Sequence, residues 1–145
     1  MKTIKKSVEI KASKEKVWDI LFDTEKSKAW YEAFMAGSHA EGNWTKDSLM
    51  LFKDAEGTGL AARVVEITPG ELVDLQYEAV VYNGKLNYDD QEAQDWKGLH
   101  ETYRVTGNGV ATTLAIESGV PDRFFGSMDE AWDNAIKKIK ELAEN

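Results

Sequence analysis

Cysteine is absent from this 145-residue sequence, and histidine and proline occur only twice each. Without cysteine, the chain has no disulfides, no thiol nucleophile and no thiolate metal site. His39 and His100 have no histidine partner at helical spacing, so a zinc site would lack ligands. We therefore expect no bound metal ion.

Motifs for cofactor binding and covalent catalysis are also missing. Gly57-Thr58-Gly59 is not followed by the helix that a phosphate-binding loop requires. No Gly-x-Ser-x-Gly motif is present, which disfavours a serine hydrolase. We expect no cofactor and assign no catalytic residue.

Long apolar runs and excess positive charge are lacking as well. No run approaches the ~20 residues of a membrane helix, so we expect no membrane insertion. The formal charge of −8 opposes phosphate backbones and predicts no nucleic-acid partner. Residues 1–6 alternate charged and apolar side chains and do not resemble a secretion signal, so a cytoplasmic location is expected.

A long amphipathic pattern begins after Pro121 and continues to the C-terminus. Its apolar residues recur at steps of three and four: Phe125, Met128, Trp132, Ala135, Ile136, Ile139 and Leu142. This spacing predicts one helix of some 22 residues with a single apolar face. Such a face must pack on another apolar surface.

The first third of the chain predicts a strand and two helices. Residues 3–12 alternate as a half-buried strand does, and Ser13 then has the properties of an N-cap for a helix ending near Phe22. A second short helix is predicted over residues 25–34. It would present Trp30 and Phe34 on one side.

The middle of the chain predicts strands joined by turns. The segments are Asn43–Thr45, Leu49–Phe52, Leu60–Ile67, 72–82, Trp96–Thr106 and Val110–Ser118. Residues 85–95 are polar and acidic, and we expect a long loop or an irregular hairpin end there.

The predicted order is a strand, two helices, six strands and a helix, which is an α+β fold. Short turns make consecutive strands antiparallel, so we expect a curved antiparallel sheet of about seven strands. The strand over 72–82 would span about 36 Å and the last helix about 33 Å, as helix-on-sheet packing requires. No repeat or linker interrupts the chain, so residues 1–145 are expected to form a single domain.

Several residues carry a resemblance to a known family. They are Val17-Trp18 and Leu21-Phe22, Trp30, Phe52 with Gly57, Val64-Val65-Glu66 before Pro69, Trp96 with Glu101-Thr102-Tyr103, Thr112-Thr113-Leu114, and Met128 with Trp132. In these the chain resembles the START-related (SRPBCC) superfamily. Within it, the chain is most similar to the branch named after the activator of the ninety-kilodalton heat-shock chaperone's ATPase.

The resemblance covers nearly the whole chain and implies the helix-grip fold, in which the curved sheet wraps around the long C-terminal helix. It also implies a possible chaperone contact. In the eukaryotic activator a separate N-terminal domain makes much of that contact, and no such domain is seen in these residues, which argues against co-chaperone activity. The superfamily shares one architecture among different ligands and activities.

A curved sheet that grips one helix tends to enclose a cavity, and alternation indicates which side chains face it. Aromatic residues with a few polar groups are typical of a small-molecule pocket. The predicted ligand-binding residues are Trp44, Phe52, Tyr77, Trp96, Glu101, Tyr103, Phe125, Met128 and Trp132. Trp44 and Trp96 either stack on a ligand at the cavity mouth or close the open end of the sheet.

Glu101 is the most informative of these residues, because a carboxylate on an apolar face is costly unless it is paired. Arg63 is a candidate partner if Ala61, Arg63 and Val65 point inward. The alternatives are a structural ion pair and a group that orients a ligand or transfers protons. His100 is adjacent and therefore points to the opposite face of the strand.

Three functions are consistent with these features. The leading hypothesis is a non-enzymatic protein, monomer or homodimer, that binds a small apolar, aromatic or lipid-like molecule. The second is a cyclase, hydratase or hydrolase that uses Glu101 with Tyr103 or Tyr77 as acid and base. The third is a chaperone-interaction module with an exposed apolar patch around Trp30, Tyr31 and Phe34.

Overall fold

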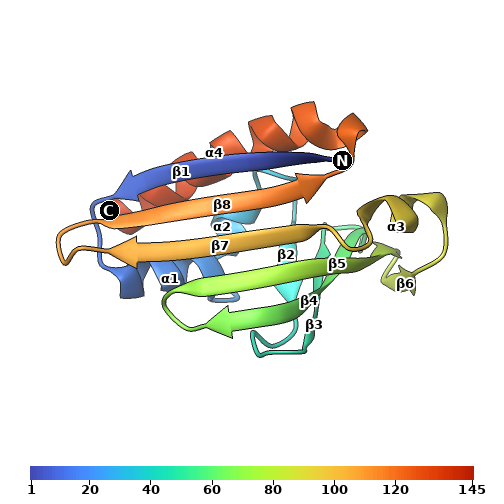
Figure 1. The fold of residues 1–145 in the computed structure, drawn as a ribbon, viewed down its shortest axis with the longest axis horizontal. Coiled ribbons are helices and arrows are strands. Elements are labelled where there is room, and N and C mark those ends of the chain that lie inside the picture. The colour runs from blue at the N-terminus through green and yellow to red at the C-terminus, as the bar shows by residue number, and fades with distance from the viewer.

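In the computed structural model, which describes residues 1–145, one antiparallel sheet forms the front of the molecule and the main helices lie behind it (Figure 1). The elements, in chain order, are β1 (Lys2–Ile10), α1 (Lys14–Phe22), α2 (Lys28–Tyr31), β2 (His39–Glu41), β3 (Leu49–Lys53), β4 (Gly59–Thr68), β5 (Leu72–Tyr82), β6 (Lys85–Asn87), α3 (Gln91–Trp96), β7 (His100–Gly107), β8 (Thr112–Val120), a 3-10 turn (Asp122–Phe124) and α4 (Phe125–Glu144).

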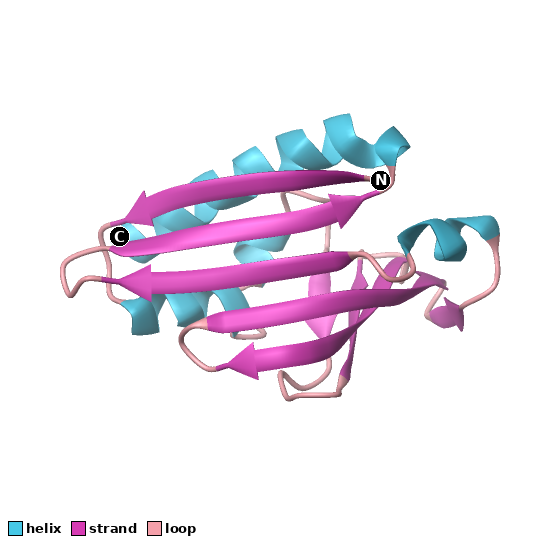
Figure 2. Ribbon diagram, in the orientation of Figure 1, coloured by secondary structure: helices cyan, strands magenta, loops and turns pink.

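The sheet has eight strands in the order β1-β8-β7-β5-β4-β3-β2, and β6 pairs with β5 outside this path. The first strand therefore pairs with the last, along the full length of β1 from Lys2 to Ile10. The far strands curl back toward the helices, so that one concave face is covered and one convex face is open (Figure 2). The predicted α+β class and helix-grip arrangement are confirmed.

The long helix α4 packs its apolar stripe against the concave face. Trp132, Ala135 and Ile139 are buried, as predicted, and the last turn buries Ala143 rather than Leu142. The helix has 20 residues, which gives a length of about 30 Å. The helix α1 begins where predicted, because the Ser13 hydroxyl accepts a hydrogen bond from the Lys16 amide.

The strand β5 has the predicted bounds, but its inward face changes partway along. Ala61 pairs with Ala79 and Ala62 pairs with Tyr77, so Glu78 is an extra residue in the ladder. Tyr77 therefore packs in the main core, whereas Ala79 packs in a separate cluster with Ala61. Strict alternation would place Ala79 on the same face as Tyr77, but the bulge moves it to the other face.

The same region overturns the expected pair of Arg63 and Glu101. Ala62 and Val64 point into the core, which places Arg63 on the other face of β4. There its guanidinium donates two hydrogen bonds of 2.8 Å to the carboxylate of Glu78. Glu101 has no cationic partner.

Two boundary predictions are wrong. The strand expected at Asn43–Thr45 lies earlier, at β2, where Ala40 pairs with Phe52. Gly42, with φ of 126°, directly follows the strand, and residues 42–48 form a loop. The second helix is shorter than predicted and spans only Lys28–Tyr31.

Of the two alternatives expected for residues 85–95, a long loop or an irregular hairpin end, the structure shows the hairpin end, followed by a helix. The short strand β6 pairs with β5, and Asp90 caps the helix α3 by accepting from the Ala93 amide at 2.8 Å. As a result, Trp96 ends a helix and does not begin β7. No helix in the structure is long and apolar enough to cross a membrane.

Candidate functional site

A cavity of about 170 Å³ lies between the concave face of the sheet, the segment around α2, and α4. Its inner wall is mostly aromatic: Trp30, Tyr31, Phe34, Phe52, Tyr77, Tyr103 and Trp132, with Glu101 and Met128, of which Phe34, Phe52 and Met128 are half-buried and the others buried. Its outer rim is more exposed and polar: Met35, Ser38, His39, Lys53, Asp54, Thr58, Gly59 and Leu60. The cavity is therefore apolar along its walls, with one acidic group inside.

Glu101 is only 7% exposed, and three hydroxyl groups surround its carboxylate. The Tyr77 hydroxyl donates to Oε1 at 2.8 Å, and the Tyr103 hydroxyl donates to Oε2 at 2.6 Å. The Ser118 hydroxyl donates to Oε1 at 3.3 Å. Adjacent strands supply these groups, since Glu101 pairs with Leu75 of β5 on one side and with Ser118 of β8 on the other.

Burial sets the protonation behaviour of this cluster. It raises the pKa of Glu101, and the hydrogen bonds from Tyr103, Tyr77 and Ser118 offset part of that rise. Burial and then the charge of Glu101 raise the pKa of Tyr77 and of Tyr103 well above their ordinary range. The tyrosines therefore remain protonated at neutral pH and act as donors to the carboxylate.

Two residues that line the cavity each carry a donor with no protein acceptor. The indole N–H of Trp132 is buried without a hydrogen-bond partner. The Tyr31 hydroxyl makes no hydrogen bond in the protein, and burial followed by the charge of Glu101 raises its pKa well above the usual range. By contrast, the indole N–H of Trp30 donates to the Ile20 carbonyl at 3.0 Å.

The rim of the cavity is held by a small charged group. Glu41 accepts from Lys53 at 2.9 Å and from His39 at 2.7 Å, which lowers the pKa of the Glu41 carboxyl. Gly59 permits the close pairing of β3 and β4 at this rim, because a Cβ there would overlap the carbonyl oxygen of Phe52. The Lys53 ammonium at the rim is thus paired with the Glu41 carboxylate.

The structure brings six of the nine predicted site residues to the cavity. They are Phe52, Tyr77, Glu101, Tyr103, Met128 and Trp132. These six come from β3, β5, β7 and α4, four elements that are distant in sequence.

The other three predicted residues do not line the cavity. Trp44 packs edge-on to Phe22 at a centroid distance of 4.9 Å. Trp96 packs edge-on to Tyr77 at 5.2 Å, behind the cavity wall. Phe125 lies near the Lys2 ammonium, 5.1 Å from its ring centroid.

Sequence reasoning missed the contribution of the α2 segment to the cavity wall. The chaperone hypothesis required Trp30, Tyr31 and Phe34 to form an exposed patch, but Trp30 is 0% exposed and Tyr31 is buried. Trp30 stacks on Tyr31 at 4.1 Å, and Phe34 meets the edge of Trp132 at 5.0 Å. The i, i+4 spacing of Trp30 and Phe34 was the signal for a shared inward face.

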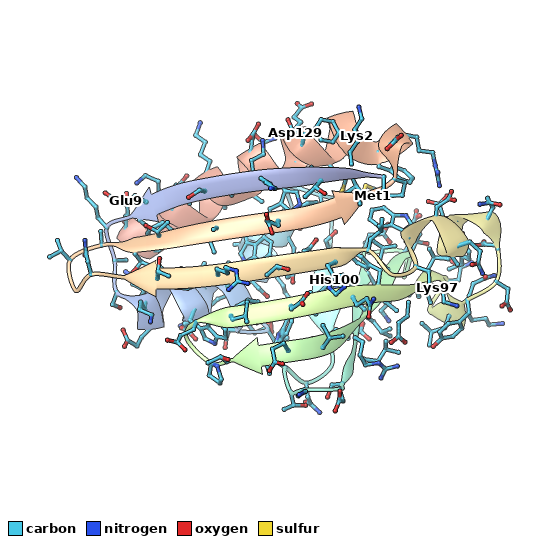
Figure 3. The ribbon with its side chains drawn as sticks, in the orientation of Figure 1. Met1, Lys2, Glu9, Lys97, His100 and Asp129 are labelled. Atoms are coloured by element: carbon cyan, nitrogen blue, oxygen red, sulfur yellow. The ribbon has the colours of Figure 1, made fainter.

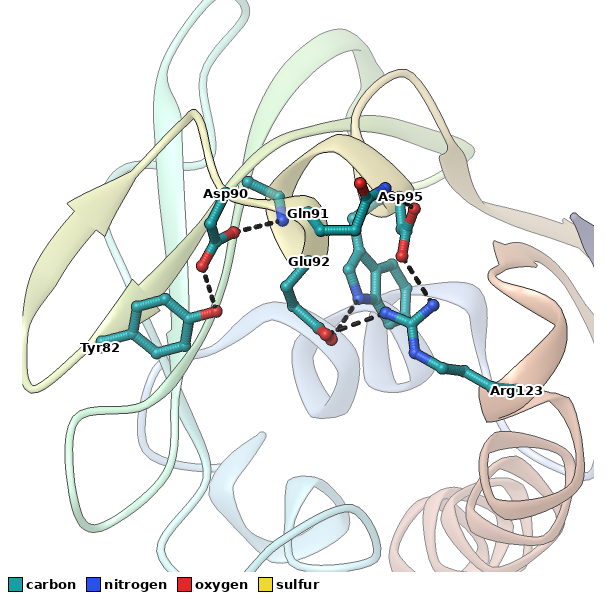
Figure 4. A network of polar contacts seen from close by, with 8 residues as sticks. Tyr82, Asp90, Gln91, Glu92, Asp95 and Arg123 are labelled. Carbon is teal, nitrogen blue, oxygen red and sulfur yellow. Dashed lines mark hydrogen bonds and ion pairs between the residues drawn. The ribbon is translucent and has the colours of Figure 1, made fainter.

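A polar network connects α3 to the 3-10 turn that precedes α4 (Figure 4). Arg123 donates to Asp95 at 2.7 Å and to Glu92 at 2.9 Å, and the Tyr82 hydroxyl donates to Asp90 at 2.8 Å. The network holds α3, and with it Trp96, against the cavity wall.

His100 lies on the convex face of the sheet, as its position beside Glu101 predicts (Figure 3). It is exposed, and its Nδ1 lies 2.7 Å from the Asp74 carboxylate. It therefore takes no part in the cavity. No cluster of three or more histidine, aspartate or glutamate side chains is arranged to hold a metal ion.

Comparison with known proteins adds a family and a set of related folds. The family model described as "Activator of Hsp90 ATPase homolog 1-like protein" matches residues 11–144. The Aha1 dimer from Colwellia psychrerythraea has a TM-score of 0.75 at 18% identity, over 99% of this chain and 97% of that chain. No curated protein matches the chain.

Two further solved structures share the fold. A protein from Mesorhizobium loti has a TM-score of 0.75 at 16% identity, over 97% of this chain and 96% of the other. CalU16 from Micromonospora echinospora has a TM-score of 0.70 at 13% identity, over 97% of this chain and 75% of that one. At these identities the likeness concerns the fold alone.

Proposed function

This chain belongs to the family of Activator of Hsp90 ATPase homolog 1-like proteins, and on that premise we propose that it binds a small apolar or aromatic molecule in the cavity between sheet and α4. The aromatic wall is the observation that supports this proposal. Seven aromatic side chains converge on one cavity, although close packing normally leaves few voids larger than a water molecule.

The size of the cavity limits the ligand. A dry apolar cavity of about 150 Å³ is sufficient to bind benzene. At about 170 Å³, this cavity accommodates one ring with a small substituent. This favours an aromatic ligand over a lipid-like one.

Saturable uptake of toluene tests the proposal. We expect binding of one toluene per chain by native mass spectrometry or ligand-observed NMR. We also expect a rise in thermal midpoint with toluene concentration, because a ligand that binds only the folded state stabilises it. The absence of both effects would contradict the proposal.

A pair of matched variants separates cavity binding from surface binding. Met128→Trp adds bulk to a cavity-lining position of α4, whereas Ile136→Trp adds the same bulk to a half-buried position of α4 outside the cavity. We expect the first variant to abolish toluene uptake and the second to preserve it.

The Glu101 cluster supports proton-transfer catalysis as a second candidate function. A buried carboxylate with a raised pKa, bonded to two tyrosines in a cavity, has the properties of a general acid or base. A carboxyl pKa of Glu101 near the ordinary glutamate value of about 4.3, measured by ¹³C NMR titration, would exclude this role.

A chaperone contact has less support. The apolar patch that it requires around Trp30 is buried in this structure. A pull-down with the middle domain of the chaperone tests it, and capture that survives Met128→Trp would assign the contact to another surface.

A further inference from the structure

An unpartnered donor at the cavity describes the ligand more closely than the apolar wall does. The Tyr31 hydroxyl lies on the cavity and makes no hydrogen bond in the protein. A ligand that fills the cavity excludes water from this hydroxyl, and a donor that then lacks an acceptor weakens binding. A ligand that supplies an oxygen atom therefore gains affinity here.

Glu101 adds a second requirement, because its carboxylate can accept a hydrogen bond from the ligand. A carboxylate has about four acceptor sites, and its three hydroxyl donors use two on Oε1 and one on Oε2. No cationic side chain is among the groups that act on Glu101. The carboxylate therefore retains room for one more donor.

Few functional groups meet both requirements. A hydrocarbon neither accepts a hydrogen bond from Tyr31 nor donates one to Glu101. A ligand carboxylate would bring a second negative charge to a buried acidic site, which is costly at low dielectric. An ammonium donates to Glu101 but offers no acceptor. A neutral hydroxyl group both accepts and donates.

Resting on the function proposed above, we infer that the ligand is an uncharged single-ring molecule with a hydroxyl group, of the phenol class. Its oxygen accepts from Tyr31, its O–H donates to Glu101, and its ring packs on the aromatic wall. A site built to bond a hydroxyl discriminates strongly against the analogue that lacks it.

Binding of four one-ring probes to the unmodified protein tests this inference. Phenol, anisole, toluene and benzylamine are compared at pH 7 by titration calorimetry. We expect phenol to bind about tenfold more tightly than toluene, as one net hydrogen bond allows, with anisole between them because it accepts but does not donate. Benzylamine should bind more weakly than phenol.

A conservative variant locates the hydrogen bond. Tyr31→Phe removes the donor and keeps the ring, so it should lower the preference for phenol over toluene. Tyr82→Phe is the matched control, because it removes a tyrosine hydroxyl that donates to Asp90 and lies outside the cavity. It should leave the phenol-to-toluene ratio unchanged.

The outcomes separate this inference from the function on which it rests. Equal affinity for phenol and toluene, or a preference that survives Tyr31→Phe, overturns the inference and leaves apolar binding in place. Tighter binding of benzylamine than of phenol also overturns it. If none of the four probes binds, both proposals fail. The four-probe comparison on the unmodified protein decides the matter even if a variant does not fold.

Discussion

At the scale of single residues, Glu101 shows how a buried charge is accommodated without an opposite charge. Three hydroxyl groups replace the water that burial removes from its carboxylate. They do so incompletely, because burial still raises the pKa of Glu101. The ionised carboxylate therefore reduces the stability of the fold.

Replacement by glutamine makes this cost measurable. With its pKa raised on folding, Glu101 binds a proton more readily in the folded state. Its contribution to stability is thus fully present below the unfolded pKa of about 4.3 and is lost as pH rises through the folded pKa. In Glu101→Gln the side chain at position 101 stays uncharged at every pH. The thermal midpoint of this variant should therefore rise relative to that of the unmodified protein as pH increases from 4 to 7.

The comparison must be made between the two proteins at each pH. Other carboxyls, including Glu41 and Glu78, have pKa values lowered by ion pairs, so acid destabilises both proteins through them. A difference in thermal midpoint between Glu101→Gln and the unmodified protein that does not change from pH 4 to 7 would contradict a raised pKa.

Two tryptophans of the core permit a matched test of an unsatisfied donor. Trp30→Phe breaks a buried hydrogen bond to the Ile20 carbonyl, while Trp132→Phe removes an N–H that has no partner. We expect Trp30→Phe to be the more destabilising by about 1–2 kcal/mol in urea denaturation, since loss of ring volume is common to both. Equal losses would mean that the Trp132 N–H is satisfied by solvent.

Part of the site was predictable from residue patterns. Alternation along β7 places Glu101 and Tyr103 on the inward face, and alternation along β5 adds Tyr77. It does not place Trp96, because a helix intervenes before β7. Nor does it place Arg63, which lies on the convex face of β4.

At the scale of elements, the short helix α3 depends on its contacts with the 3-10 turn that precedes α4. Arg123 bridges Glu92 and Asp95, while only Ala93 and Trp96 are buried from α3 itself. Exposed ion pairs contribute little to global stability. We expect these ion pairs to act locally, by making the opening of α3 less frequent.

Arg123→Gln should therefore speed amide hydrogen exchange in α3 with little change in thermal midpoint. Exchange in β8, the central partner of β1 and β7, serves as the internal reference. Arg123→Lys retains the charge but loses the two-pronged geometry, so its effect should be intermediate. Unchanged exchange in α3 would show that Trp96 alone holds the helix.

Periodicity predicted the long elements well. The helix α4 and the strand β5 have strong 3.6-residue and two-residue patterns, which long segments display clearly. The helix α3 was missed because acidic residues suggested a solvated loop, although Asp90 followed by Ala93 and Trp96 is an N-cap with a one-sided apolar spacing. Bulges such as the one at Glu78 have no comparable sequence signal.

At the scale of the whole molecule, the two ends of the chain are bound to each other. The strand β1 pairs with β8, and the N-terminal ammonium lies 2.9 Å from the Asp122 carboxylate. At the opposite end of β1, the Lys11 amide donates to Glu144 at 2.8 Å. Neither end can detach without opening the sheet and uncovering α4.

This interlocking predicts that residues 1–145 unfold as one domain. In urea, circular dichroism at 222 nm and tryptophan fluorescence should report the same midpoint, because the five tryptophans are distributed over α1, α2, the loop before β3, α3 and α4. The slope should be about 1–3 kcal/mol per molar urea, as for other small proteins. Separated midpoints would show that some part of the sheet opens first.

The control for fraying at the chain ends is Asp122→Asn, which removes the ion pair between Met1 and Asp122. Both midpoints should still coincide in this variant, because an exposed ion pair contributes little beside nine residues of strand pairing.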